Sequence, residues 1–314
     1  MRFYGNEICC GSYACLNAMR NSAIDVKLFE ISTSTPFGIK HYENNQFDRL
    51  LTTYCDPNKG LDAAIELWGY SSKKFVETSV KEAVKSIKEK ITPRNRIVLG
   101  PIDMGELSYH VMPQLFKRMD HYVTLEYASE EEVYCFDSEG ISGFQINFID
   151  LEKYISVKEV EEAENKITFR IIGETGGWSK KDILIQSYKQ ANYNLLKAEK
   201  EGEGSYAIER CFEFLQDYDN YKWKLSLQYD IQYLLQRKWL FNVLIEEYEK
   251  VVGKTSAQML QIVEIIEIQK KVIGYIYNDL RKNGIIEKSL FKKLSTLEKE
   301  LGKCAECEYN VNFQ

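Results

Sequence analysis

The chain has 314 residues, 44% of them apolar and 28% charged, so it is too apolar to be disordered and long enough for one large or two ordinary domains. Its net charge of −6 and isoelectric point near 5.4 argue against a general affinity for nucleic acid or anionic membranes. No apolar run approaches the roughly 18 residues of a membrane span, and the first residues lack the pattern of a signal peptide, so we expect a cytoplasmic protein without a membrane partner.

The first elements expected along the chain are helices. Residues 11–21 follow Cys10 directly, residues 60–69 form a short amphipathic stretch closed by glycine, and residues 77–90 carry valine and isoleucine on one face. Strand signals come next. Runs rich in β-branched and aromatic residues predict strands at 96–100, 121–127, 132–136, 143–149 and 166–172, the second and third of which are joined by a polar turn.

The sequence changes character near residue 175. Residues 173–177 contain closely spaced glycines and form the clearest linker. After the linker no proline occurs, and apolar residues recur at three- and four-residue steps. This pattern predicts long helices near 180–199, 205–219, 221–250, 256–283 and 287–301. We therefore expect an α+β domain at residues 1–175 and an appended α-helical bundle at residues 176–314.

The eight cysteines are scattered through apolar stretches, as is typical of reduced core residues in a cytosolic enzyme. Cys304 and Cys307 form a single CxxC pair with no second pair and no histidine nearby, so we interpret this pair as incidental and expect no metal site. No glycine-rich phosphate loop or dinucleotide fingerprint is present, which disfavours a nucleotide-dependent ligase.

Cys10 is the first candidate for a chemical role, because it immediately precedes a predicted helix. The positive end of a helix favours a thiolate over a thiol, and the unpaired N–H groups of the first turn are available to an oxyanion. Most free cysteines, however, are buried structural residues. Cys10 alone does not decide between a nucleophile and a core residue.

His121 and Asp137 favour the nucleophile. The chain has only three histidines, and His121 opens one predicted strand while Asp137 closes the next. A hairpin would place these two strand ends side by side, so that the carboxylate fixes the tautomer of the imidazole and supports its charged form. His41 lies in a polar loop and His110 follows another loop, and neither has an acid at a matching position.

These three residues and their surroundings resemble a known family. Cys10-Gly11-Ser12, His121-Tyr122-Val123 and Asp137 are similar to the cysteine, histidine and aspartate motifs of papain-like peptidases of the C39 type. The segments 60–62, 99–105 and 137–140 look more like the butirosin-type side-chain acyltransferases and the closthioamide-type amide synthetases. The resemblance covers about residues 5–155.

The resemblance implies a papain-like fold and a Cys–His–Asp catalytic triad. It also implies an amide-forming reaction in natural-product biosynthesis, with the acyl or peptidyl chain supplied as the thioester of a carrier protein's phosphopantetheine and passed to a small amine, a diamine or an aminoglycoside. No further cofactor is implied. The peptidases carry a glutamine before the cysteine as an oxyanion donor; here Asn6 stands in that region, with Gly11 as support.

Two carboxylates upstream of His121, Asp103 and Glu106, are candidates to bind the distal ammonium of a cationic amine, although a strand-capping or solvated role is equally open. The helical bundle is expected to act as a lid and a docking surface for the carrier protein, and its apolar helices could bury a homodimer interface. Two alternatives remain, a papain-like cysteine peptidase and a catalytically silent scaffold protein.

Overall fold

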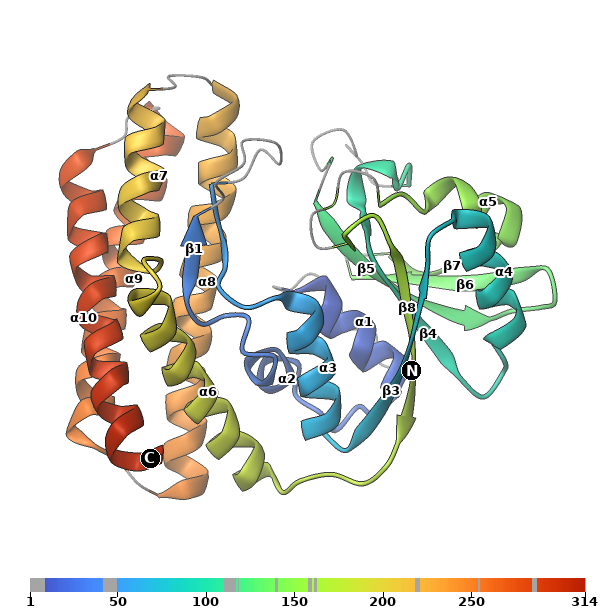
Figure 1. Ribbon diagram of the computed structural model, residues 1–314, viewed down its shortest axis with the longest axis horizontal. Coiled ribbons are helices and arrows are strands. Elements are labelled where there is room, and N and C mark those ends of the chain that lie inside the picture. The colour runs from blue at the N-terminus through green and yellow to red at the C-terminus, as the bar shows by residue number, and fades with distance from the viewer. Residues whose placement is uncertain are drawn as a thin grey trace. The chain divides into compact units, whose positions relative to one another are not determined.

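The computed structural model describes residues 9–41, 50–109, 117, 119–138, 141–157, 160, 163–217, 221–253, 255–283 and 287–313. In these residues a six-stranded antiparallel sheet with flanking helices is followed by a set of long helices (Figure 1). The predicted α+β class is confirmed.

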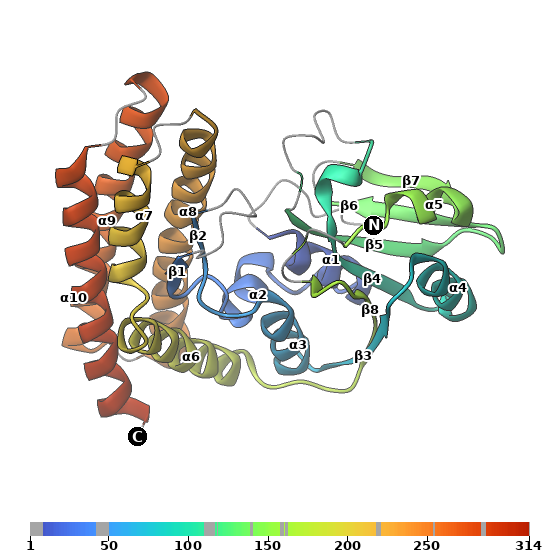
Figure 2. The same cartoon turned by 45° about the horizontal axis from the view of Figure 1, so that its top comes forward.

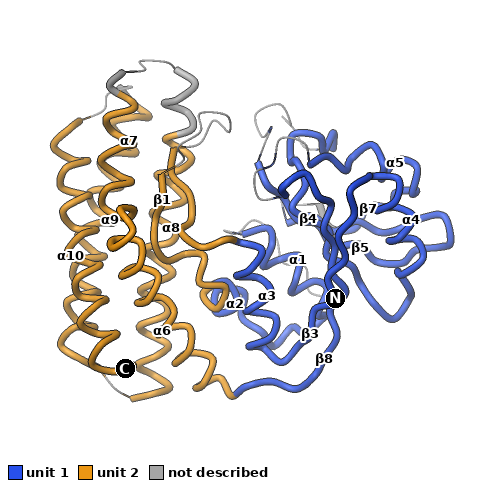
Figure 3. Tube along the Cα trace, viewed as in Figure 1, with its two compact units in different colours: residues 1–30, 57–178 blue, residues 31–56, 179–314 orange. Residues whose placement is uncertain are grey.

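The chain divides into two compact units, residues 1–30 with 57–178 and residues 31–56 with 179–314 (Figure 3). The division predicted from sequence, 1–175 and 176–314, differs in the segment 31–56, which belongs with the long helices. Backbone contacts explain this membership, because the Asp230 carboxylate accepts hydrogen bonds from the N–H groups of Leu50 and Leu51 at 2.8 and 2.9 Å. We call the two parts the sheet unit and the helical unit.

The sheet unit contains the following elements in chain order: α1 (Cys10–Met19), α2 (Val26–Ser32, which continues into the segment of the helical unit), α3 (Pro57–Leu67), β3 (Tyr70–Glu77), α4 (Val80–Lys90), β4 (Arg96–Asp103), β5 (Asp120–Tyr127), β6 (Glu132–Asp137), β7 (Ile141–Asn147), α5 (Phe148–Tyr154) and β8 (Ile167–Glu174). The strand order is β3-β8-β4-β5-β6-β7, and every neighbouring pair is antiparallel.

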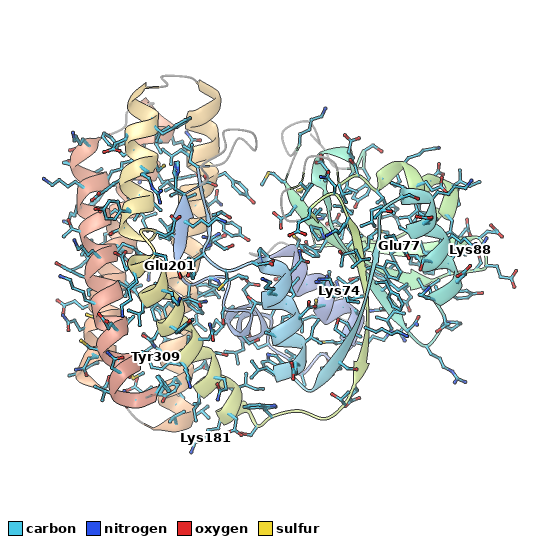
Figure 4. All side chains as sticks on the ribbon, viewed as in Figure 1. Lys74, Glu77, Lys88, Lys181, Glu201 and Tyr309 are labelled. Atoms are coloured by element: carbon cyan, nitrogen blue, oxygen red, sulfur yellow. The ribbon has the colours of Figure 1, made fainter. Side chains whose placement is uncertain are left out.

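Both faces of the sheet are covered, which follows from the alternation of side chains along its central strands. Ile97 and Leu99 of β4 belong to a core with α4 and α5, whereas Val98 between them belongs to a second core with α1 and α3. The polar outer side of the α4 layer carries Lys88, labelled in Figure 4, whose ammonium lies 2.9 Å from the Glu131 carboxylate. The sheet is therefore buried at its centre, where β4 and β5 run.

The helical unit contains the short strands β1 (Ile39–His41) and β2 (Leu51–Thr53) and five helices, namely α6 (Lys180–Lys200), α7 (Ser205–Asp217), α8 (Tyr221–Val252), α9 (Ala257–Asn283) and α10 (Lys288–Phe313). The helices α7 to α10 run side by side (Figures 1 and 2). Ser179 caps α6 by accepting the N–H of Asp182. The helix α10 continues past residue 301, where the sequence pattern predicted its end.

Candidate functional site

The hairpin of β5 and β6 brings His121 and Asp137 together. Val123 pairs with Asp137 across the hairpin, and His121 lies two residues before Val123, so the two side chains share a face of the sheet. His121 Nε2 lies 2.9 Å from Asp137 Oδ1. The two residues are only 1% and 0% exposed, which places the imidazole and the carboxylate in a water-poor environment.

This geometry sets the chemistry of the imidazole. With Asp137 ionised, Nε2 carries the proton that points to the carboxylate, and the lone pair of the neutral ring is on Nδ1. We assign this tautomer from the contact, because hydrogens follow the hydrogen-bond network. Nδ1 is then the nitrogen that can accept a proton from a substrate or a nucleophile.

The helix α1 lies alongside β5 and places Cys10 at the same end as His121. Cys10 Sγ is 4.0 Å from the carbonyl oxygen of Asp120, and the Thr124 hydroxyl donates to the carbonyl of Ala14 at 2.8 Å. These contacts show that helix and strand run in the same direction. Cys10, the first residue of the helix and partly exposed, therefore lies beside the backbone that leads into His121.

Gly11 allows this close approach. A Cβ atom at residue 11 would lie 2.8 Å from Leu61 Cδ1 of α3 and 3.4 Å from Tyr122 Cδ2 of β5. The hydroxyl of Tyr122 donates to Asn58 Oδ1 at 3.1 Å, so the ring is held from α3 as well. Close packing against Leu61 and Tyr122 therefore explains the glycine at position 11. The predicted role of Gly11 in supporting an oxyanion stays a prediction.

Burial raises the pKa of the Cys10 thiol well above its usual range, and the neighbouring Cys9 and Asp120 raise it further. The positive end of α1 opposes this effect, but a helix terminus contributes at most about 2 kcal/mol, or roughly 1.5 pKa units. Burial can contribute up to about 3–5 units in fully buried groups. The net direction for Cys10 is upward, which favours the thiol, so Cys10 needs a base to become a nucleophile.

Cys9 is the other thiol at the start of α1. Burial raises its pKa well above the usual range, and the charge of Glu30 adds to this, although the N–H groups of Ser12 and Gly11 lower it. Glu30 is 5% exposed and accepts a hydrogen bond from the Ser12 hydroxyl. The two cysteines thus differ in surroundings, and Cys10 is the one that contacts the backbone beside His121.

Of the other predicted site residues, Asp103 lies on β4 directly opposite Asp120 of β5. Asp103 is 3% exposed and accepts the N–H of Gly105 at 2.8 Å, so it caps the turn after β4. Glu106 is exposed, and its binding of an ammonium group stays a prediction. Asn6 and His110 lie outside the described residues.

His41 and the CxxC cysteines belong to the helical unit. The backbone N–H of His41, on β1, donates to the Glu203 carboxylate at 3.0 Å. Cys304 and Cys307 both lie within α10, the first buried and the second exposed. Among the residues that the structure describes, no group of three or more potential ligand residues could hold a metal ion.

Sequence analysis did not identify Tyr109. Its hydroxyl donates to Asp137 Oδ2 at 2.6 Å, so each oxygen of this carboxylate has a hydrogen-bond contact. Tyr109 lies 28 positions before Asp137 in the sequence, and no local pattern indicates that its hydroxyl reaches the end of β6. In the sequence, Tyr109 is recognisable only as a tyrosine that precedes the candidate histidine His121, which does not indicate a contact with Asp137.

No family model matches the chain. Over 119 residues the chain is 31% identical to the uncharacterized protein YobF of Bacillus subtilis (strain 168), a match that covers 37% of each chain. The chain thus spans well under half the length of this relative. None of the described helices is long and apolar enough to cross a membrane.

Proposed function

We propose that the protein is a cysteine-dependent N-acyltransferase with a papain-like fold, in which Cys10 carries the acyl group, His121 moves protons and Asp137 orients His121. The observation that carries the proposal is the buried His121–Asp137 hydrogen bond of 2.9 Å. It lies at the end of the strands next to which Cys10, the first residue of α1, is placed. A helix that presents a thiol to a histidine–carboxylate pair on an antiparallel sheet is the arrangement that the resemblance to papain-like enzymes implies.

In the first half-reaction, Nδ1 of His121 takes the proton of the Cys10 thiol as Sγ attacks the carbonyl carbon of a thioester. The tetrahedral intermediate then expels the donor thiolate, which receives the proton from the imidazolium. The acyl group is left on Sγ and the donor leaves as a thiol. Because the resting thiol is protonated, proton transfer accompanies the attack.

In the second half-reaction, a neutral amine attacks the Cys10 thioester and His121 takes a proton from the amine nitrogen. Collapse of the intermediate breaks the C–S bond, and Sγ recovers a proton from the imidazolium. The net reaction converts a thioester and an amine into an amide and a thiol. Backbone N–H groups at the start of α1, with the support proposed for Asn6 and Gly11, would hold the oxyanion, each donor contributing about 3–4 kcal/mol.

The choice of an acyltransferase over a peptidase rests on the second group of similar segments. One of them, Gly60-Leu61-Asp62, is part of α3. There Leu61 packs against Gly11, and Asp62 accepts a 2.7 Å hydrogen bond from the buried Arg170. Leu61 thus packs against the start of α1 and Asp62 joins α3 to β8, while the preference for an acyltransferase rests on the resemblance of these segments alone.

The acyl donor proposed is a carrier-protein thioester and the acceptor is a small amine or aminoglycoside, without a further cofactor. Docking of the carrier protein on the helical unit, a homodimer and a cytoplasmic location are parts of the same proposal. Asp103 has a capping role in the structure, so Glu106 is the better candidate for an acceptor's distal ammonium.

The test is incubation of the purified protein with an acyl-carrier thioester, followed by intact-mass and peptide analysis. Trypsin releases residues 3–20, and fragmentation of this peptide assigns an adduct to Cys9, Cys10 or Cys15. We expect an adduct on Cys10 that is lost on addition of an amine, with formation of the amide. The matched variants are Cys10→Ala, which should form no adduct, and Cys9→Ala, which should form one.

Each other outcome counts against the proposal in a defined way. An adduct that only water releases favours the peptidase. The absence of any adduct in the wild type favours the scaffold protein, and acylation of Cys10→Ala at the wild-type rate removes Cys10 from the mechanism.

A further inference from the structure

The Asp137 carboxylate is held at both of its oxygens. Oδ1 lies 2.9 Å from His121 Nε2, and Oδ2 accepts the Tyr109 hydroxyl at 2.6 Å. A hydrogen bond to an ionised acceptor is shorter and about twice as strong as one between neutral groups. A carboxylate fixed at Oδ2 has little freedom to rotate, so Oδ1 stays directed at the imidazole.

We infer that Tyr109 is a positioning residue, which acts through Asp137 to hold His121 in its reactive orientation. The effect of Tyr109 on catalysis rests on the proposed function, because the orientation of His121 affects the reaction only if His121 deprotonates Cys10. Tyr109 touches neither substrate nor Cys10 in this scheme. Its effect is transmitted by one hydrogen bond to a carboxylate that is 0% exposed.

Tyr109 is itself held in place by aromatic packing. Its ring centroid is 4.7 Å from that of Phe144 in β7 and 5.8 Å from that of Tyr154 in α5, the latter in an edge-to-face arrangement. Such contacts fix the direction of the phenol ring. This aromatic packing therefore directs the Tyr109 hydroxyl toward Asp137.

The Tyr109 hydroxyl is the donor to Asp137, and other titratable groups lie around the His121–Asp137 pair. Cys10 of α1 and Cys135 of β6 both lie close enough to Asp137 for its charge to raise the pKa of their thiols. Burial raises the pKa of the Tyr109 phenol, and Cys135 and Asp137 raise it further. Tyr109 thus stays protonated and remains a donor throughout the working pH range. It partly offsets the cost of keeping Asp137 ionised in the core.

Histidine-selective ¹⁵N labelling gives a direct test, because the chain has only three histidines and His121→Ala identifies the signal of His121. A wild-type Nε2–H that is bonded to a buried carboxylate should give a downfield proton that exchanges slowly with water. We expect Tyr109→Phe to lose this resonance through faster exchange. The matched control, Tyr154→Phe, removes a hydroxyl from the same aromatic cluster and should retain it.

The same variants are then compared in Cys10 acylation and amine transfer. At metal sites, loss of a partner that orients a histidine ligand typically costs about 10- to 100-fold in affinity or activity, and we use that range as the scale for His121. We expect kcat of Tyr109→Phe to fall by that factor with KM for the thioester unchanged, while Tyr154→Phe resembles the wild type. A role in folding alone would lower the melting temperature of Tyr109→Phe and leave its kcat and the Nε2–H signal intact.

The outcomes separate this inference from the proposed function. If Tyr109→Phe keeps the downfield proton and matches Tyr154→Phe in kcat, Tyr109 is a packing residue and the inference is overturned. If the wild type forms no acyl adduct but Tyr109→Phe still loses the proton, the positioning role stands and the proposed function fails.

Discussion

The sheet unit and the helical unit both bury charged side chains, but they do so in different settings. In the helical unit, Lys238 of α8 lies 2.6 Å from the Glu298 carboxylate of α10, and Gln269 of α9 donates to the same oxygen at 2.6 Å. In the sheet unit, the His121–Asp137 pair follows Asp120, whose carbonyl oxygen contacts the Cys10 thiol at the start of α1. The first cluster joins three helices, whereas the second lies next to the candidate nucleophile Cys10.

Buried charge is therefore not by itself a functional signal. A buried ion pair must overcome the desolvation of both partners, and its best-attested benefit is to specify which elements pack together. The Lys238–Glu298 pair fits that structural role. The His121–Asp137 pair has a titratable ring whose second nitrogen can exchange protons, and that property turns a buried pair into a candidate for catalysis.

The strongest test of this contrast is Asp137→Asn. The amide has the shape of the carboxylate but does not support the imidazolium, and it favours the wrong tautomer of the histidine. We expect Cys10 acylation to fall by about 10⁴-fold with little change in stability, as in other triads. Asp120→Asn is the matched control, since Asp120 also lies near Cys10; its neutralisation should leave acylation at least as fast as in the wild type. Equal losses in the two variants would contradict a specific role for Asp137.

The corresponding change in the helical unit is Lys238→Met, which should affect stability and not chemistry. Removal of one partner leaves Glu298 buried with an uncompensated charge, at a cost of about 3–5 kcal/mol in the free energy of unfolding. Urea denaturation followed by circular dichroism measures this cost. The double variant Lys238→Met/Glu298→Gln keeps an acceptor for Gln269 and should recover most of the loss. A Lys238→Met protein of unchanged stability whose folded fraction has lost acylation would reverse our assignment of the two clusters.

The next contrast compares one substitution at two helical glycines. Gly11→Ala would place a methyl group 2.8 Å from Leu61 Cδ1, whereas Gly274 in α9 has no atom within 4 Å of an added Cβ. Overpacking at Gly11 should cost about 1–3 kcal/mol and slow acylation, because the start of α1 must move. Gly274→Ala should stabilise by about 0.5–1 kcal/mol, because it reduces the flexibility of the unfolded chain. Thermal melts and acylation rates measure both, and similar effects at the two sites would show that packing at Gly11 is loose.

The sequence predicted the hairpin that carries the site because β5 and β6 follow the rules of strands. Both consist of alternating β-branched and aromatic residues, with a polar turn between them. The edge strand β3 escaped prediction because it pairs only with β8 and carries exposed lysines and serines, a composition typical of edge strands and of loops alike. The expected helix there begins only at Val80.

What the sequence could not predict depends on contacts between distant residues. The segment 31–56 joins the helical unit through Asp230, which lies far along the chain. Tyr109 contacts Asp137 from 28 positions earlier in the chain. The state of the Cys10 thiol depends on burial and on Asp120, neither of which a helix-terminus argument includes. In each case local patterns predict the helix or strand, whereas tertiary packing determines the role of its residues.

The smallest predicted effect compares two thiols of the same chain. Burial and the charges near Cys10 raise its pKa, so at pH 7.5 nearly all of it is the unreactive thiol. Cys307 is exposed on α10 and provides an internal reference. We expect iodoacetamide to modify Cys10 more slowly than Cys307, because a raised pKa leaves less of the reactive thiolate at Cys10.

The pH dependence separates this effect from poor access, which would slow the reaction equally at every pH. A raised pKa means that the Cys10 thiolate population is still growing above pH 9, so its alkylation rate should continue to rise there. A rate that is already maximal at pH 7 would indicate a preformed thiolate–imidazolium pair with His121. The sheet unit would then hold a buried pair of opposite charges, as the helical unit does with Lys238 and Glu298. In that case the proton would move from Cys10 to His121 before the thiolate attacks the thioester.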